Sequence, residues 1–181
     1  YKDNIQDVCR SFEKRWSSVK MSKVQNVFLV GAKSLGAYGG YETFVYKLTE
    51  YHQNNPNIKY HVACKANGDG CMDETKLDNV KRVSDSEFEF HNARCFKIHI
   101  PQIGPAQAIY YDVAALRECC KYIKKNNIEN PIVYIMACRI GPFARYFYMK
   151  IHKLGGKVYL NPDGHEWMRA KWSAPIRKYW K

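Results

Sequence analysis

Apolar and polar residues follow two alternating periods along this chain, and the two periods predict strands and helices in turn. Short apolar runs predict parallel strands at 25–31, 60–64, 95–100, 132–137 and 157–160. Apolar residues spaced three and four apart predict amphipathic helices at 41–53, 105–126 and 142–154. Because strands and helices alternate, we expect an α/β fold: a Rossmann-like, doubly wound, mainly parallel sheet.

Two further patterns refine this picture. Glu87 to Phe90 alternate charged and aromatic residues, which predicts an edge strand or a hairpin with the next run. The polar stretch 65–84 before it predicts a long loop. In the helix 105–126, one buried stripe is expected from Ile109, Val113, Leu116, Cys120 and Ile123. In the helix 142–154, one face is expected to hold Phe143, Phe147, Ile151 and Leu154.

Composition sets the size of the domain and limits its class. A chain of 181 residues with 46% hydrophobic residues can form one domain with a real core. We assign residues 24–181 to that domain and 1–23 to an N-terminal extension that lacks the apolar region of a signal peptide. No apolar run is long enough for a transmembrane helix.

The seven cysteines include no CxxC pair, so free thiols are expected. A zinc site could be drawn from a few scattered side chains, but their spacing matches no compact zinc pattern, and we predict no metal and no cofactor. The residues in question are His61, Cys64, Cys71, His91 and Cys95.

A glycine-rich loop, residues 31–40, joins the first strand to the first helix. Glycine lets backbone approach a ligand closely, and a helix start offers free N–H groups and positive partial charge to an anion. The glycine spacing matches neither the dinucleotide fingerprint nor a Walker loop. We interpret Gly39 and Gly40 as the start of a helix that faces the diphosphate of an activated sugar. The alternative is a tight packing turn.

Two other loops follow strands at the same expected edge, where open α/β sheets bind ligands. They are residues 137–142, which include Arg139, and residues 161–167, which include Asp163, His165 and Glu166. A histidine beside carboxylates can act as an acid or base, or hold a sugar hydroxyl. The alternative is structural: Asp163 shapes a turn and Glu166 pairs with Arg169.

The formal charge of the chain is +12, with a dense basic and aromatic region at 169–181. Such a region suits nucleic acid, an anionic membrane surface or a phosphorylated substrate. A solvated helix with aromatic core contacts is the alternative.

Two stretches together, residues 39–45 (Gly-Gly-Tyr-Glu-Thr-Phe-Val) and 161–172 (Asn-Pro-Asp-Gly-His-Glu-Trp-Met-Arg-Ala-Lys-Trp), resemble the N-terminal domain of bacterial GT-B glycosyltransferases. The similarity is to the rhamnosyltransferase-like group of capsule and cell-wall polysaccharide synthesis. It extends over residues 24–181. Where many such enzymes have a histidine after the fourth strand, this chain has Cys138 and Arg139.

The resemblance implies a cytoplasmic, peripheral enzyme at the inner face of the cell membrane. It implies a retaining hexosyl transfer without metal, from a nucleotide sugar, dTDP-L-rhamnose, to a lipid-linked saccharide acceptor. It also implies a second, C-terminal donor domain that is absent from this chain, so we expect residues 1–181 alone to be inactive.

The resemblance further implies roles for individual residues. Donor phosphate would lie against Gly39, Gly40 and Tyr41. Catalysis would involve Asp163, His165 and Glu166. The remaining substrate contacts would come from Glu42, Arg139, Arg169 and Lys171.

Two other functions compete with this interpretation. A non-catalytic module for an anionic ligand or nucleic acid would use the basic tail, although no known nucleic-acid motif is present and we predict no nucleic-acid partner. A nucleotide-dependent oxidoreductase or epimerase is disfavoured by the glycine spacing, and residues 61–65 offer no acidic group for a ribose.

Overall fold

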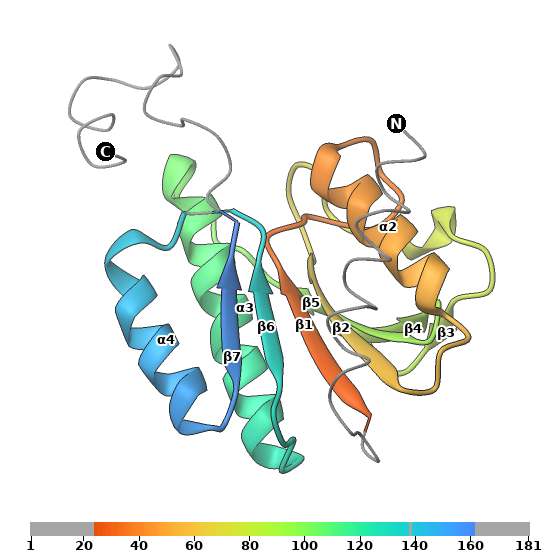
Figure 1. Cartoon of the computed structure of the whole chain (residues 1–181). Coiled ribbons are helices and arrows are strands. Elements are labelled where there is room, and N and C mark those ends of the chain that lie inside the picture. The colour runs from red at the N-terminus through yellow and green to blue at the C-terminus, as the bar shows by residue number, and fades with distance from the viewer. Residues whose placement is uncertain (1–23, 138, 162–181) are drawn as a thin grey trace.

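The computed structural model describes residues 24–137 and 139–161, and these form one seven-stranded sheet (Figure 1). The strand order is β3-β4-β5-β2-β1-β6-β7. The strands are β1 (Gln25–Val30), β2 (Ile58–Lys65), β3 (Lys81–Arg82), β4 (Glu87–Phe90), β5 (Ala93–Ile98), β6 (Ile132–Ile135) and β7 (Lys157–Leu160).

The central part of the sheet is parallel, as the alternation of strands and helices predicts. β5, β2, β1, β6 and β7 pair in parallel, whereas β3 and β4 pair antiparallel beside β5. The predicted α/β, Rossmann-like, mainly parallel fold is therefore confirmed. The predicted hairpin of residues 87–90 is present too, with β3 as the outermost strand.

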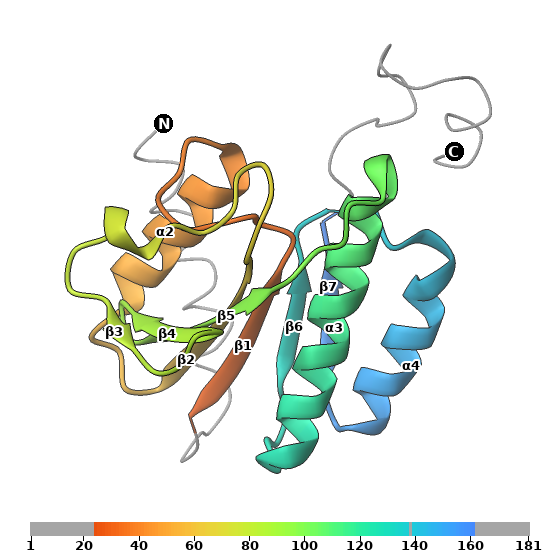
Figure 2. The same cartoon turned by 180° about the vertical axis from the view of Figure 1, so that it is seen from behind.

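Helices cover both faces of the sheet (Figures 1 and 2). Helix α2 (Gly40–His52) packs on one face through Val45 and Leu48. Helices α3 (Gln107–Lys125) and α4 (Ala144–Lys153) pack side by side on the other. Most of the predicted α3 stripe is buried there, with Ile109 only partly buried.

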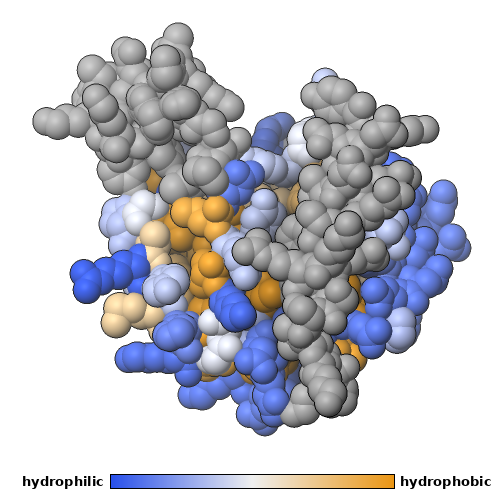
Figure 3. Space-filling model, viewed as in Figure 1, coloured by the Kyte–Doolittle hydropathy of each residue, from blue (hydrophilic) through white to orange (hydrophobic). Residues whose placement is uncertain are grey.

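The connection between β2 and β4 carries more structure than the sequence indicates. The polar stretch 65–84 contains a 3-10 turn, Glu74–Lys76, as well as β3. Figure 3 shows hydrophilic residues on the side of the molecule where β3 and β4 lie, whereas hydrophobic residues reach the surface around β6 and β7.

The turns before α3 and α4 are alike. Each has the sequence Ile-Gly-Pro, at 103–105 and 140–142, a glycine with positive φ and a 3-10 turn that leads into the helix. The second turn corrects a sequence expectation, because Phe143 does not share the buried face of Phe147 and Ile151. It is 44% exposed. A 3-10 turn has three residues per turn instead of 3.6, so the helical spacing does not extend back to Phe143.

Candidate functional site

The strand order reverses between β1 and β6, because the chain runs from β1 towards β2 on one side and from β6 to β7 on the other. In open α/β sheets, ligands bind beyond the carboxyl ends of the strands at this point. The glycine loop leaves β1 there, and residues 136–140 leave β6. The N–H of Met136 donates to the carbonyl of Val30 at 2.8 Å, so the two connections start in contact.

The close approach of the two connections explains why the first residue of the loop is a glycine. Gly31 has φ +123°, and an added Cβ would lie 3.2 Å from the Cβ of Met136. A larger residue is therefore disfavoured both by backbone conformation and by the neighbouring connection.

Arg139 joins the two connections. Its Nη2 donates to the carbonyl of Gly31 at 2.9 Å, and its Nε and Nη2 donate to the two carboxylate oxygens of Asp112 at 2.8 and 3.1 Å. Asp112 comes from the first turns of α3, and its side chain is fully buried. The predicted substrate residue Arg139 therefore reaches the switch point, where it also holds three elements together.

Burial and charge act against each other in this pair. Burial raises the pKa of Asp112, and the Arg139 charge opposes that rise. Burial alone would lower the pKa of Arg139, but the carboxylate of Asp112 outweighs burial and the pKa is raised. The bidentate geometry favours a charged pair, with the Arg139 side chain still 24% exposed.

Side chains from distant elements hold the glycine loop. The hydroxyl of Tyr111 donates to the carbonyl of Ala32 at 2.5 Å. The N–H of Lys33 donates to Oε1 of Glu42 at 2.9 Å, and the N–H of Leu35 donates to the Met72 sulfur at 3.3 Å. Glu42, predicted to contact substrate, thus folds back from α2 onto the loop.

The two glycines at the helix start differ in their surroundings. Gly39 is the N-cap of α2, and an added Cβ would lie 2.1 Å from Oε2 of Glu42. An added Cβ on Gly40 would meet no described atom within 4 Å. A larger residue at position 39 would therefore displace the carboxylate of Glu42, whereas Gly40 begins the helix beside open space and is followed by the half-buried Tyr41.

Two lysines that sequence reasoning missed lie at the same edge. Lys33 follows β1, and its Nζ lies 3.0 Å from Oδ2 of Asp69. Lys65 ends β2, is largely buried, and donates to the carbonyl of Asp69 at 2.6 Å. Burial, with the nearby Lys33 charge, lowers the pKa of Lys65. The sequence signal for Lys65 was its position at the carboxyl end of a predicted strand.

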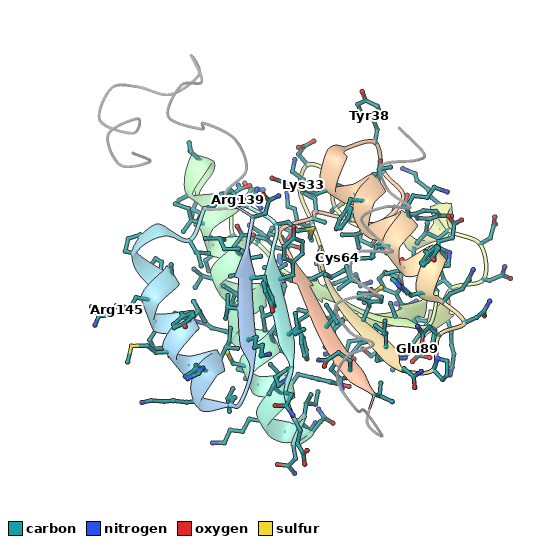
Figure 4. The ribbon with its side chains drawn as sticks, viewed as in Figure 1. Lys33, Tyr38, Cys64, Glu89, Arg139 and Arg145 are labelled. Carbon is teal, nitrogen blue, oxygen red and sulfur yellow. The ribbon has the colours of Figure 1, made fainter. Side chains whose placement is uncertain are left out.

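Three cations therefore gather at the carboxyl edge: Lys33, Lys65 and Arg139. Figure 4 shows Lys33 and Arg139 at this end of the sheet, from different connections. Asp112 neutralises Arg139 and the exposed Asp69 pairs with Lys33. The arrangement can attract an anion that displaces Asp69, beside the N–H groups of the α2 start.

The other predicted site residues, Asp163, His165, Glu166, Arg169 and Lys171, lie outside the described residues. The structure thus brings the glycine loop and Arg139 together and leaves the catalytic roles as predictions.

The described residues contain no candidate metal site. They contain no group of three or more histidine, cysteine or acidic side chains arranged to hold an ion. Among the cysteines and histidines considered for zinc, His61 stacks on Phe28 and donates through Nε2 to Oδ1 of Asn26. Burial lowers the pKa of His61 to about 3. Among these residues no helix has the length and apolar character needed to cross a membrane.

Fold and site together define an α/β domain with a basic, glycine-lined edge at the switch point of its sheet. Residues 24–181 match a family described as a domain of unknown function, DUF1972. The chain belongs to this family. No curated protein matches it.

Proposed function

We propose that this chain is the N-terminal, acceptor-side domain of a GT-B sugar transferase. The reaction is transfer of a hexosyl group, L-rhamnose from dTDP-L-rhamnose, to a lipid-linked saccharide in polysaccharide synthesis at the inner face of the cell membrane. The observation that carries the proposal is the meeting of the glycine loop and the β6 connection at the switch point, through Arg139 and Gly31. The family is also known from the N-termini of glycosyltransferases.

The local charges suit the chemistry of such a reaction. Both substrates carry a diphosphate. The nucleotide sugar releases a nucleoside diphosphate, and fixed positive charge stabilises the negative charge that develops on it. The lipid-linked acceptor holds its saccharide through a diphosphate, which the same cations can bind. Lys33 and Lys65 provide cations without a metal, and the start of α2 at Gly40 provides N–H groups. In this proposal the donor base and ribose bind to a second domain, so sugar transfer by residues 1–181 alone would contradict it.

The test is calorimetric binding of the chain to a water-soluble saccharide diphosphate that carries a short prenyl group. We expect binding that weakens with salt and falls about tenfold or more in the double variant Lys33→Ala/Lys65→Ala, because each lysine contributes a charge-assisted contact. Lys47→Ala is the matched control, since Lys47 pairs with Glu50 on the surface of α2.

Two results would contradict the proposal. One is equal binding by the wild type and the double variant. The other is weak saccharide binding together with strong oligonucleotide binding that falls steeply with salt, which would support the nucleic-acid alternative.

A further inference from the structure

We propose that the two Ile-Gly-Pro turns and the outer face of α4 form a surface that docks onto an anionic lipid bilayer. This extends the proposed function, because a lipid-linked acceptor presents its saccharide at a bilayer, but it has its own evidence. We call the exposed apolar residues of the two turns and of the start of α3 the apolar rim. They are Ile103, Pro105, Ala106, Tyr110, Pro142 and Phe143.

The rim contains large hydrophobic side chains that are exposed to solvent. Ile103 is 45% exposed, Phe143 44% and Tyr110 40%. Single exposed apolar residues are ordinary, whereas a contiguous group marks an interaction surface. Residues 100–111 contain no charged side chain at all, and neither do residues 140–144.

The two turns lie at the same end of the molecule. Each precedes a helix that follows a parallel strand, so both turns lie at the carboxyl edge of the sheet. Helices α3 and α4 contact each other, and Figures 1 and 2 show their N-terminal ends at the same end of the molecule. The rim therefore spans two helix starts that lie at the same edge of the sheet, although they are far apart in the sequence.

Charge identifies the occupant of this surface. Between residues 130 and 162 the sequence contains no aspartate or glutamate. The outer face of α4 exposes Arg145 and Lys153 among Tyr146, Tyr148 and Met149, and Figure 4 shows Arg145 pointing away from the sheet. Apolar residues, amphipathic tyrosines and basic side chains on one surface are typical of binding at an anionic membrane interface.

The rim also lies beside the candidate site. Arg139 is followed directly by the second turn, whose buried Ile140 anchors the exposed Pro142 and Phe143. A bilayer under the rim would thus bring its headgroups to the edge of the sheet where Lys33, Lys65 and Gly40 lie.

The experiment is co-sedimentation of the whole chain with phosphatidylglycerol-containing vesicles and with pure phosphatidylcholine vesicles. We expect preferential binding to the anionic vesicles. The double variant Ile103→Ser/Phe143→Ser should bind them about tenfold more weakly, from the apolar area lost. Arg145→Glu/Lys153→Glu should bind at least about tenfold more weakly, from the lost and reversed charge.

The matched control is Tyr51→Ser/Val83→Ser, which removes two exposed hydrophobic residues away from the rim and should bind like the wild type. All these positions are exposed, and thermal unfolding should show that each variant folds. Vesicle binding driven instead by the basic residues 169–181 would be unaffected by the rim and α4 variants, and that result would overturn the proposal.

Two other outcomes would also overturn it: absence of binding to anionic vesicles, and self-association of the chain that the rim variant abolishes. The test is separable from that of the proposed function. Rim variants should still bind the soluble saccharide diphosphate, whereas Lys33→Ala/Lys65→Ala should still bind vesicles.

Discussion

The glycine loop and the two Ile-Gly-Pro turns occupy equivalent places, each between a parallel strand and a helix, yet they are built differently. The glycine loop is tied by side chains of Glu42, Met72 and Tyr111. No side chain within the described residues caps the two Ile-Gly-Pro turns, which rely on proline and a 3-10 hydrogen-bonding pattern. The glycine loop is thus held by side chains along its own length, whereas the Ile-Gly-Pro turns are held by side chains only at the residues that precede them, Ile100 through Asn67 and Arg139 through Asp112.

The largest expected loss of stability comes from removing the ion pair of Asp112 and Arg139, which connects these regions. Asp112→Ala leaves the guanidinium of Arg139 partly buried without its carboxylate, and we expect the free energy of unfolding to fall by about 3–5 kcal/mol. Denaturant unfolding of the variant measures this loss.

A double variant sharpens the result. Asp112→Leu/Arg139→Met removes both charges and should recover much of the stability lost in Asp112→Ala, because no charge remains buried. A loss below about 1 kcal/mol in Asp112→Ala would show that the pair does not anchor the glycine loop.

An intermediate effect is expected within the glycine loop. In Gly39→Ala the new Cβ would displace the carboxylate of Glu42 from the N–H of Lys33, which costs about 1–3 kcal/mol for a lost hydrogen bond and strain. Gly40→Ala is the control, because its Cβ has room and alanine suits a helix better. Thermal unfolding of both variants compares them, and equal melting temperatures would contradict the assigned contact.

The smallest effect belongs to an Ile-Gly-Pro turn. Gly104 has φ +59° and no described atom within 4 Å of an added Cβ, so Gly104→Ala meets only backbone strain. That strain is about 1–2 kcal/mol, and the lower entropy of the unfolded chain offsets part of it, so we expect a net loss of up to about 1 kcal/mol. Gly104→Asn should lose less in the same unfolding measurement. Equal losses for alanine and asparagine would show that conformation is not the cause.

The elements of the fold were predictable because their signals are local. Apolar periodicity gave the central strands and helices, and the alternation of residues 87–90 gave the hairpin. Phe143 was misassigned to a buried face because a proline-led 3-10 turn changes the spacing over three residues. That change depends on Gly141 and its positive φ, which a count of apolar positions does not contain.

The candidate site was predictable only in part. Strand ends and glycines pointed to the loop and to Arg139. The partner Asp112 could not be found, because it lies within a helix and appears in the sequence as one polar residue beside the buried Val113. Contacts between residues that are 27 or 108 positions apart depend on the tertiary fold.

The ion pair of Arg139 and Asp112 has a mechanical consequence. Asp112 belongs to α3, Gly31 to the start of the glycine loop, and Arg139 to the connection that leads into α4. The ion pair therefore couples these three parts, and a shift of either turn of the apolar rim would pull on the backbone of Gly31 at the switch point. A force applied at the rim, such as contact with a bilayer, would therefore be transmitted through Arg139 to the start of the glycine loop.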